Sequence, residues 1–214
     1  TRFALVSWAS EMCIRDRFLE DRAAKPLVIT GEPGIGKSRL VYEFIETRSV
    51  DDPEIFWASC QTDQVLRESF NPLRYWLKRY FEINDTQAES RNKRNFNRNL
   101  DQLLAATPDE RLAAELDRTR SFIGSLVDLF WDDSLFEQLD PKGKYENTLT
   151  GLTSLLQAIS LQQPVVVYLE DVQWLDEASK AFLERLYRSI ESADGKRFAI
   201  LILATSRDYC AQEC

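Results

Sequence analysis

Short apolar runs alternate with segments of helical periodicity along most of this chain. Four runs have the length and the apolar content of buried strands, namely residues 26–30, 55–59, 165–169 and 198–204. Runs that are apolar throughout are typical of parallel strands covered on both faces. The pattern therefore predicts an α/β fold in which helices flank a parallel β-sheet.

A long helical insertion is predicted between the second and the third strand. Apolar side chains recur there at helical spacing in four stripes, over residues 70–80, 96–104, 122–130 and 145–159. Aromatic and leucine side chains at this spacing are most simply core residues rather than a ligand-binding surface. Each stripe therefore predicts a helix that packs against the rest of the domain.

The loop after the first strand has the spacing G-x-x-x-x-G-K-[ST] of a phosphate-binding loop. Its glycines let backbone N–H groups approach phosphate oxygens. Lys37 is expected to place its ammonium between the terminal phosphates, and Ser38 its hydroxyl on Mg²⁺. The helix that opens at Lys37 directs unpaired N–H groups at the same anion. The predicted nucleotide-binding residues are Gly31, Glu32, Pro33, Gly34, Ile35, Gly36, Lys37, Ser38 and Arg39.

Polar residues follow the third and the fourth strand, at the edge where an open parallel sheet binds its ligands. The third strand ends in Glu170 and Asp171, the apolar-strand-then-acids pattern called Walker B. One carboxylate is expected to hold Mg²⁺ together with Ser38, and the next to orient or deprotonate an attacking water. Arg207, after the fourth strand, is expected to reach the γ-phosphate; the alternative is an exposed loop arginine.

Two segments, Gly31–Leu40 and Val167–Ser179, resemble the ATPase module of signal-transduction ATPases with numerous domains, the AAA-like STAND class of P-loop proteins. The similarity extends over about residues 18–207 and points to the ATPases of bacterial transcriptional regulators and of cyclase- or kinase-linked signalling proteins. It implies that the Walker B strand lies one strand away from the phosphate-loop strand. It also implies ATP and Mg²⁺ as ligands and a nucleotide-controlled switch that governs oligomerisation.

The resemblance also implies a role for each matching residue. Lys37 and Ser38 would bind phosphate and Mg²⁺, Glu170 would be the acid on the metal side, Asp171 the catalytic acid and Arg207 the sensor. Glu170 departs from the family pattern, which commonly has aspartate at this position. The hydrophobic-Gly-Arg segment before the first strand, the fifth strand and the helical lid of the family have no counterpart in this sequence.

These departures predict a partial P-loop ATPase domain over residues 18–214, with residues 60–163 as its helical insertion. The codons of residues 6–17 can be written as a transposase-type sequencing adapter, apart from a one-base slip before Ser10. Residues 1–17 are therefore interpreted as a foreign leader that is excluded from the fold. The alternative is a native helix that carries Ile14 and Phe18.

The charge and the composition of the chain limit the kinds of partner that it is expected to bind. The net charge of −8 argues against direct nucleic-acid binding, and the basic cluster Arg91–Arg98 is more simply a solvated face. The sequence has no apolar run of membrane-spanning length and no signal peptide, which favours a cytoplasmic protein without membrane contact. It has no histidine, and its four cysteines lack C-x-x-C spacing, so they are expected to be free thiols rather than zinc ligands.

Three functions remain open at this point. The favoured one is a slow ATPase whose ATP or ADP state is a signal to other domains of the same protein and to further copies of it. The second is a scaffold in which bound nucleotide controls assembly without being hydrolysed. The third is a P-loop kinase, which the adjacent acids disfavour because they suit water as the nucleophile.

Overall fold

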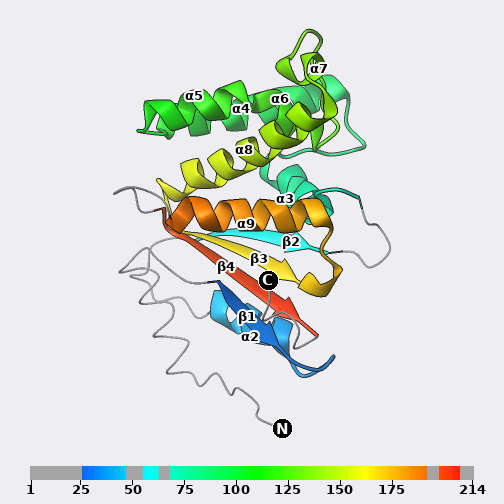
Figure 1. Cartoon of the computed structure of the whole chain (residues 1–214), viewed down its shortest axis with the longest axis vertical. Helices are drawn as coiled ribbons and strands as arrows, with labels where there is room; N and C mark the ends of the chain where they lie inside the picture. The colour runs from blue at the N-terminus through cyan, green and yellow to red at the C-terminus, as the bar shows by residue number, and fades with distance from the viewer. Residues whose placement is uncertain (1–25, 47–54, 63–67, 192–197, 208–214) are drawn as a thin grey trace.

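Four parallel strands form the sheet of the computed structural model, which describes residues 26–46, 55–62, 68–191 and 198–207. The strand order is β1-β4-β3-β2 (Figure 1). The predicted Walker B strand β3 is thus separated from the predicted phosphate-loop strand β1 by β4 alone, as the family resemblance implied. The strands are β1 Leu27–Thr30, β2 Phe56–Gln61, β3 Val165–Glu170 and β4 Ile200–Ser206.

The two central strands consist almost entirely of buried residues. All seven residues of β4 are buried, and β3 begins with three buried valines, Val165 to Val167. Val165 pairs with Ile200 and Leu169 with Ala204, so the two apolar runs lie in register along their length. Branched side chains suit such a pleated surface when helices cover both of its faces. The predicted α/β fold with a parallel sheet is confirmed.

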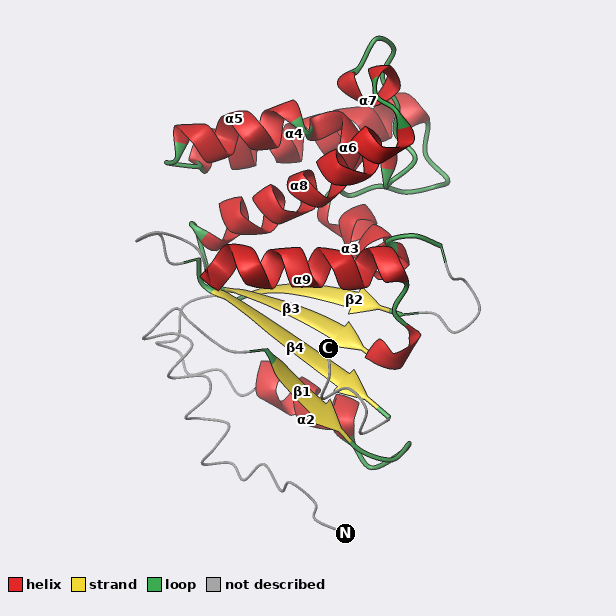
Figure 2. Cartoon of the chain, in the orientation of Figure 1, coloured by secondary structure: helices red, strands yellow, loops and turns green. Residues whose placement is uncertain are grey.

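Helices cover the two faces of the sheet unequally (Figure 2). Helix α2, Lys37–Glu46, lies on one face, where Val41 packs with Val166 and Leu201. The opposite face carries the larger core, which extends without interruption from the sheet into the helical insertion. The helices next to that face are α3 Asn71–Tyr80, α8 Pro141–Ser160 and α9 Glu177–Glu191.

The insertion between β2 and β3 is entirely helical where the structure describes it, as predicted. Its long helix α8 packs on α9 on one side and on α5 and α6 on the other. Asp140 caps α8 by accepting a hydrogen bond from the Gly143 amide, and Pro141 occupies the first turn, where no partner for its nitrogen is needed. The remaining helices are α4 Glu89–Ala106, α5 Glu110–Arg118, α6 Arg120–Ser125 and α7 Leu135–Gln138.

The helix predicted over residues 122–130 is wrong in its second half. Helix α6 ends at Ser125, and the chain then turns through Asp128, whose φ of 61° is incompatible with a right-handed helix. The Leu129 amide bonds back to the Gly124 carbonyl at 3.0 Å, which closes this turn. Phe130 is consequently 48% exposed rather than part of the core.

Asp176 joins the loop after β3 to the insertion. Its carboxylate accepts hydrogen bonds from the Ser179 amide (2.9 Å) and hydroxyl (2.6 Å), and so caps α9. The same carboxylate accepts the Phe70 amide at 3.0 Å, at the start of α3. Phe70 has a φ of 62°, a strained conformation for an aromatic residue, and its ring lies 5.9 Å from that of Tyr145 on α8. One carboxylate therefore fixes the starts of α3 and α9 together.

The structure also bears on the predictions for the basic cluster, the cysteines and membrane-spanning segments. The basic cluster on α4 is exposed or ion-paired, with Lys93 bound to Glu89 and Arg98 to Glu82, as a solvated face requires. Cys60 is a free, buried thiol, whereas the other three cysteines and the predicted leader lie outside the described residues. None of the described helices combines the length and the apolar character needed to span a bilayer.

Candidate functional site

The phosphate loop connects β1 to α2 through two glycines with positive φ. Gly34 has a φ of 80° and Gly36 a φ of 100°, a region that residues with a Cβ rarely adopt. A Cβ built on either glycine meets no atom within 4 Å, so the conformation rather than crowding requires glycine there. The Leu40 amide donates to the Gly36 carbonyl at 2.9 Å and begins the helical hydrogen bonding.

Lys37 and Ser38 lie at the start of α2 and bind different parts of the site. The Lys37 ammonium donates to the carbonyl oxygens of Gly31 (2.8 Å) and Glu32 (3.1 Å). The Ser38 hydroxyl donates to Oε1 of Glu170 at 2.7 Å, across 132 residues of sequence. The first turn of α2 contains no acidic side chain, so nothing in it offsets the positive end of the helix dipole.

The two acids leave β3 in different directions. Glu170 ends the strand, and Asp171 follows in the left-handed region with φ 55° and ψ 54°, which aspartate tolerates better than most residues. The Thr62 hydroxyl holds this turn from β2, 2.7 Å from the Glu170 carbonyl oxygen and 3.1 Å from that of Asp171. From β4, Thr205 Oγ1 accepts the Asp171 amide at 3.1 Å.

Hydrogen bonds connect the end of β4 to the loop after β1 and to the loop after β3. Arg207 donates from Nη2 to Oδ2 of Asp171 at 2.9 Å. Its backbone amide and the Ser206 hydroxyl both donate to Oε1 of Gln173, at 3.2 and 3.3 Å. The Ser206 carbonyl accepts the Gly31 amide at 3.2 Å. Since the Arg207 side chain is 47% exposed, its ion pair with Asp171 stabilises the fold little and can rearrange at low cost.

The structure thus brings together five of the predicted site residues, Lys37, Ser38, Glu170, Asp171 and Arg207, at one edge of the sheet. Other predicted residues stay apart from the acids. Arg39 pairs with Glu43 one helical turn away and is 82% exposed. The remaining predicted residues of the phosphate loop, of which only Gly31 is part-buried, are Gly31, Glu32, Pro33, Gly34, Ile35 and Gly36.

The oxygen atoms at this edge fit Mg²⁺ carried by a nucleotide. Ser38 and Glu170 offer one hydroxyl and one carboxylate, and oxygen donors are the ligands that Mg²⁺ prefers. The described residues contain no cluster of three or more acidic, histidine or cysteine side chains able to hold a metal alone. Mg²⁺ typically binds proteins through one or two carboxylates plus substrate phosphates, so this donor set matches that mode.

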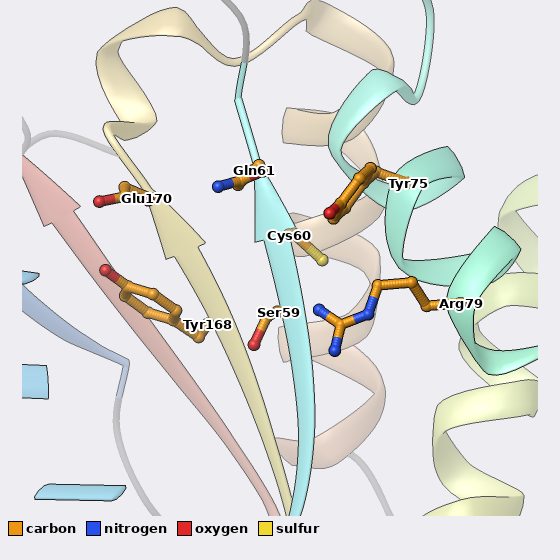
Figure 3. A pocket seen from close by; sticks show the side chains of 7 residues that line it. All are labelled: Ser59, Cys60, Gln61, Tyr75, Arg79, Tyr168 and Glu170. Atoms are coloured by element: carbon orange, nitrogen blue, oxygen red, sulfur yellow. The ribbon is translucent and has the colours of Figure 1, made fainter. Parts of the chain in front are cut away.

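A small pocket of about 120 Å³ adjoins Glu170 at the outer edge of the sheet. Tyr168 and Glu170 extend from the same side of β3, while Tyr75 and Arg79 approach from α3 (Figure 3). Burial raises the pKa of Cys60 to about 12, so this thiol is not a nucleophile at neutral pH. The lining residues are Ser59, Cys60, Gln61, Tyr75, Arg79, Tyr168 and Glu170.

Tyr168 lies beside the site, and the sequence analysis missed it. It lines the pocket next to Glu170, on the same side of β3 (Figure 3). Burial raises the pKa of Tyr168, and the negative charge of Glu170 acts in the same direction. Thr62 and Gln173 were also missed, although Thr62 directly follows a strand, and the carboxyl-end rule offered a signal for it.

Comparisons with known proteins give one family and one relative. A family model described as an AAA ATPase domain matches residues 14–202. An uncharacterized protein of Rhizobium meliloti (strain 1021) is 25% identical over 199 residues, which cover 87% of this chain and 16% of that protein. The chain thus spans about a sixth of the length of this relative. No solved structure matches.

Proposed function

This chain belongs to the AAA ATPase domain family, and on that premise we propose that it is an ATP-binding and slowly ATP-hydrolysing module that depends on Mg²⁺ and acts as a nucleotide switch in a larger signalling or transcription-regulatory protein. One observation carries the proposal. Ser38 of the phosphate loop donates to Glu170 of the Walker B strand at 2.7 Å, so the two halves of a Mg-nucleotide site meet in one place.

Each residue of the site would have its own role in binding or hydrolysis. The loop amides and the Lys37 ammonium would bind the phosphates, since charge-assisted hydrogen bonds are the strong ones. Mg²⁺, when bound with the nucleotide, neutralises phosphate charge, and Ser38 and Glu170 would hold it. Asp171 would orient an attacking water and accept its proton. Arg207 would exchange its bond to Asp171 for one to the γ-phosphate, which frees the carboxylate.

The proposed role as a nucleotide switch is supported by the resemblance of the two nucleotide-binding segments to signalling ATPases. It is also supported by a relative that is much longer than this chain. The partners would be ATP and ADP, other domains of the full-length protein, and further copies of it. The weak Arg207–Asp171 ion pair is suited to such a role, because a phosphate group can compete for the guanidinium.

The same ion pair favours a second candidate function, a nucleotide-binding scaffold that controls assembly without hydrolysis. The Arg207 guanidinium donates to Oδ2 of Asp171 at 2.9 Å, so it occupies a carboxylate oxygen that an attacking water would need. If Arg207 keeps this partner when nucleotide binds, Asp171 cannot serve as the base. Hydrolysis by the parent protein distinguishes the two candidates.

Binding of Mg-ATP to the Lys37→Ala variant tests the organising element of the site. The loss of the ammonium should weaken binding at least tenfold, because each charge-assisted hydrogen bond contributes roughly 1.5–3 kcal/mol. Lys180→Ala, which removes an exposed lysine of α9 that pairs with Glu177, is the matched control and should bind like the parent. Titration calorimetry measures both. Equal affinities of the parent and Lys37→Ala would contradict the assignment.

A further inference from the structure

A single peptide group, between Ser206 and Arg207, joins the two loops of the site. Its carbonyl oxygen accepts the Gly31 amide of the phosphate loop at 3.2 Å, and its N–H donates to Oε1 of Gln173 at 3.2 Å. The carbonyl and the N–H of a trans peptide point in opposite directions. Since β4 lies between β1 and β3 (Figure 1), this peptide connects the loop after β1 to the loop after β3.

The backbone and the side chain of Arg207 are both held by one short segment after β3. This segment contains the 3₁₀ turn η1, Val172–Trp174, which the Trp174 amide closes by donating to the Asp171 carbonyl at 3.0 Å. Asp171 accepts the Arg207 guanidinium at 2.9 Å, while Gln173 accepts the Arg207 amide. If the guanidinium leaves Asp171, the bond to Gln173 therefore still fixes the Arg207 backbone.

The bond to Gln173 continues the hydrogen bonding of β4 beyond the end of the sheet. Strand β4 ends at Ser206, which pairs with Thr30, and on the other side its register with β3 ends at Ala204. No described strand pairs with Arg207. The amide oxygen of Gln173 thus takes the place of a ladder partner for the Arg207 amide.

The donors around Gln173 determine the orientation of its side-chain amide. A backbone N–H can only donate, so the atom that faces the Arg207 amide must be the oxygen. The Ser206 hydroxyl donates to the same oxygen at 3.3 Å. In the described part of the chain, Nε2 of Gln173 is buried without a hydrogen-bond partner. Such a donor lowers stability, so stability alone is a poor explanation for a glutamine at this position.

We propose that Gln173 is a positioning residue for Arg207, and that it holds the arginine backbone while the guanidinium moves from Asp171 to the γ-phosphate of ATP. This inference rests on the proposed function. A guanidinium binds phosphate through directed hydrogen bonds, so its starting point matters. With the backbone fixed, only the side chain has to be ordered, which lowers the entropic cost of the exchange. ADP has no γ-phosphate, so Gln173 should affect ATP binding selectively.

The competing explanation is that Gln173 only stabilises the two loops. Its loss would then loosen Gly31 and the phosphate loop, which would bind the phosphates of ADP as well as those of ATP. Discrimination between the two nucleotides therefore separates the roles. Gln173→Met preserves the approximate length of the side chain and removes the amide oxygen. Gln157→Met is the matched control, because Gln157 is also part-buried and bonds to a serine hydroxyl, that of Ser189, but lies on α8 in the insertion.

The test measures two affinities of the full chain by calorimetry in excess Mg²⁺, one for ADP and one for the β,γ-imido analogue of ATP, which is not hydrolysed. Gln173→Met should bind ADP within about twofold of the parent. The ratio of analogue affinity to ADP affinity should fall about three- to tenfold, the usual net effect of one hydrogen bond. Gln157→Met should retain both affinities.

A double-mutant cycle with Arg207→Ala shows whether Gln173 acts through Arg207. Arg207→Ala should lower the same ratio at least as much, and Gln173→Met should then lower it no further. An unaltered ratio in Gln173→Met, in a parent that binds both nucleotides, would overturn this inference and leave the proposed function intact. A loss of both affinities alike, or an equal fall of the ratio in both backgrounds, would also overturn it. A parent that binds neither nucleotide would overturn the proposed function as well.

Discussion

Removal of the Asp176 carboxylate is expected to destabilise the protein far more than its position in a surface loop suggests. In Asp176→Ala, helix α9 loses its cap, which costs about 1 kcal/mol. The Phe70 amide loses its acceptor in a residue that is 5% exposed, and an unsatisfied buried donor costs about 1–3 kcal/mol. Ser179, 1% exposed, loses the partner of its hydroxyl as well. We expect a total loss of roughly 2–5 kcal/mol.

Urea denaturation followed by circular dichroism measures this loss. In a thermal melt of a chain of this size, the melting temperature should fall by roughly 4–20 °C, at about 2–4 °C for each kcal/mol. Asp176→Asn keeps one acceptor oxygen and should lose about 1 kcal/mol. Glu177→Ala is the control, since this neighbouring side chain is 90% exposed and pairs only with Lys180 one turn away; it should lose no more than roughly 1 kcal/mol.

A loss below about 1 kcal/mol in Asp176→Ala would refute this reasoning. It would mean that water replaces the carboxylate at both the Phe70 and the Ser179 amides. The strained backbone of Phe70 would then be held by its packing in the core and by the Leu73 and Arg74 amides that its carbonyl accepts.

Two further predictions concern the catalytic acid and the buried thiol. Asp171→Asn should leave Mg-ATP affinity within a few-fold but lower phosphate release at saturating ATP by roughly 10²–10⁴, the usual effect of a general base. Equal rates in the parent and this variant would favour the scaffold. Since burial raises the pKa of Cys60 from 9.0 to about 12, the unfolded chain ionises first, and stability present below pH 9 is lost as the pH rises toward 12. This difference of three pKa units corresponds to roughly 4 kcal/mol. Between pH 8 and pH 11, the free energy of unfolding should therefore fall less steeply with pH in Cys60→Ala than in the parent. Equal slopes in the two proteins would contradict the raised pKa of Cys60.

The nucleotide-binding half of the fold could be predicted from sequence because its signals are local. The phosphate loop is one uninterrupted motif, and Glu170 and Asp171 directly follow a run of apolar residues. A single rule, that ligands bind at the carboxyl ends of parallel strands, then places Arg207 at the same edge. The structure agrees with this placement: Arg207 and Asp171 lie 2.9 Å apart.

Contacts that depend on the fold left no such signal. Tyr168 stands in an apolar strand, where its ring predicts core, and only the folded structure places it in the pocket beside Glu170. The bond between Asp176 and Phe70 spans 106 residues. The end of α6 depends on the left-handed backbone of Asp128, which hydrophobic periodicity does not encode.

The strand order also determines when the site can form during synthesis. The phosphate loop follows β1, the first of the described strands to be translated, but among these strands β1 pairs only with β4, which is translated last. Leu27 can therefore pair with Leu203, and the Gly31 amide with the Ser206 carbonyl, only after β4 has been translated. Helices α4 to α8 of the insertion contact one another and are translated before β4, so they can fold first. Nucleotide binding would then require that β4 has been translated, because without β4 the loop loses its bond to the Ser206 carbonyl.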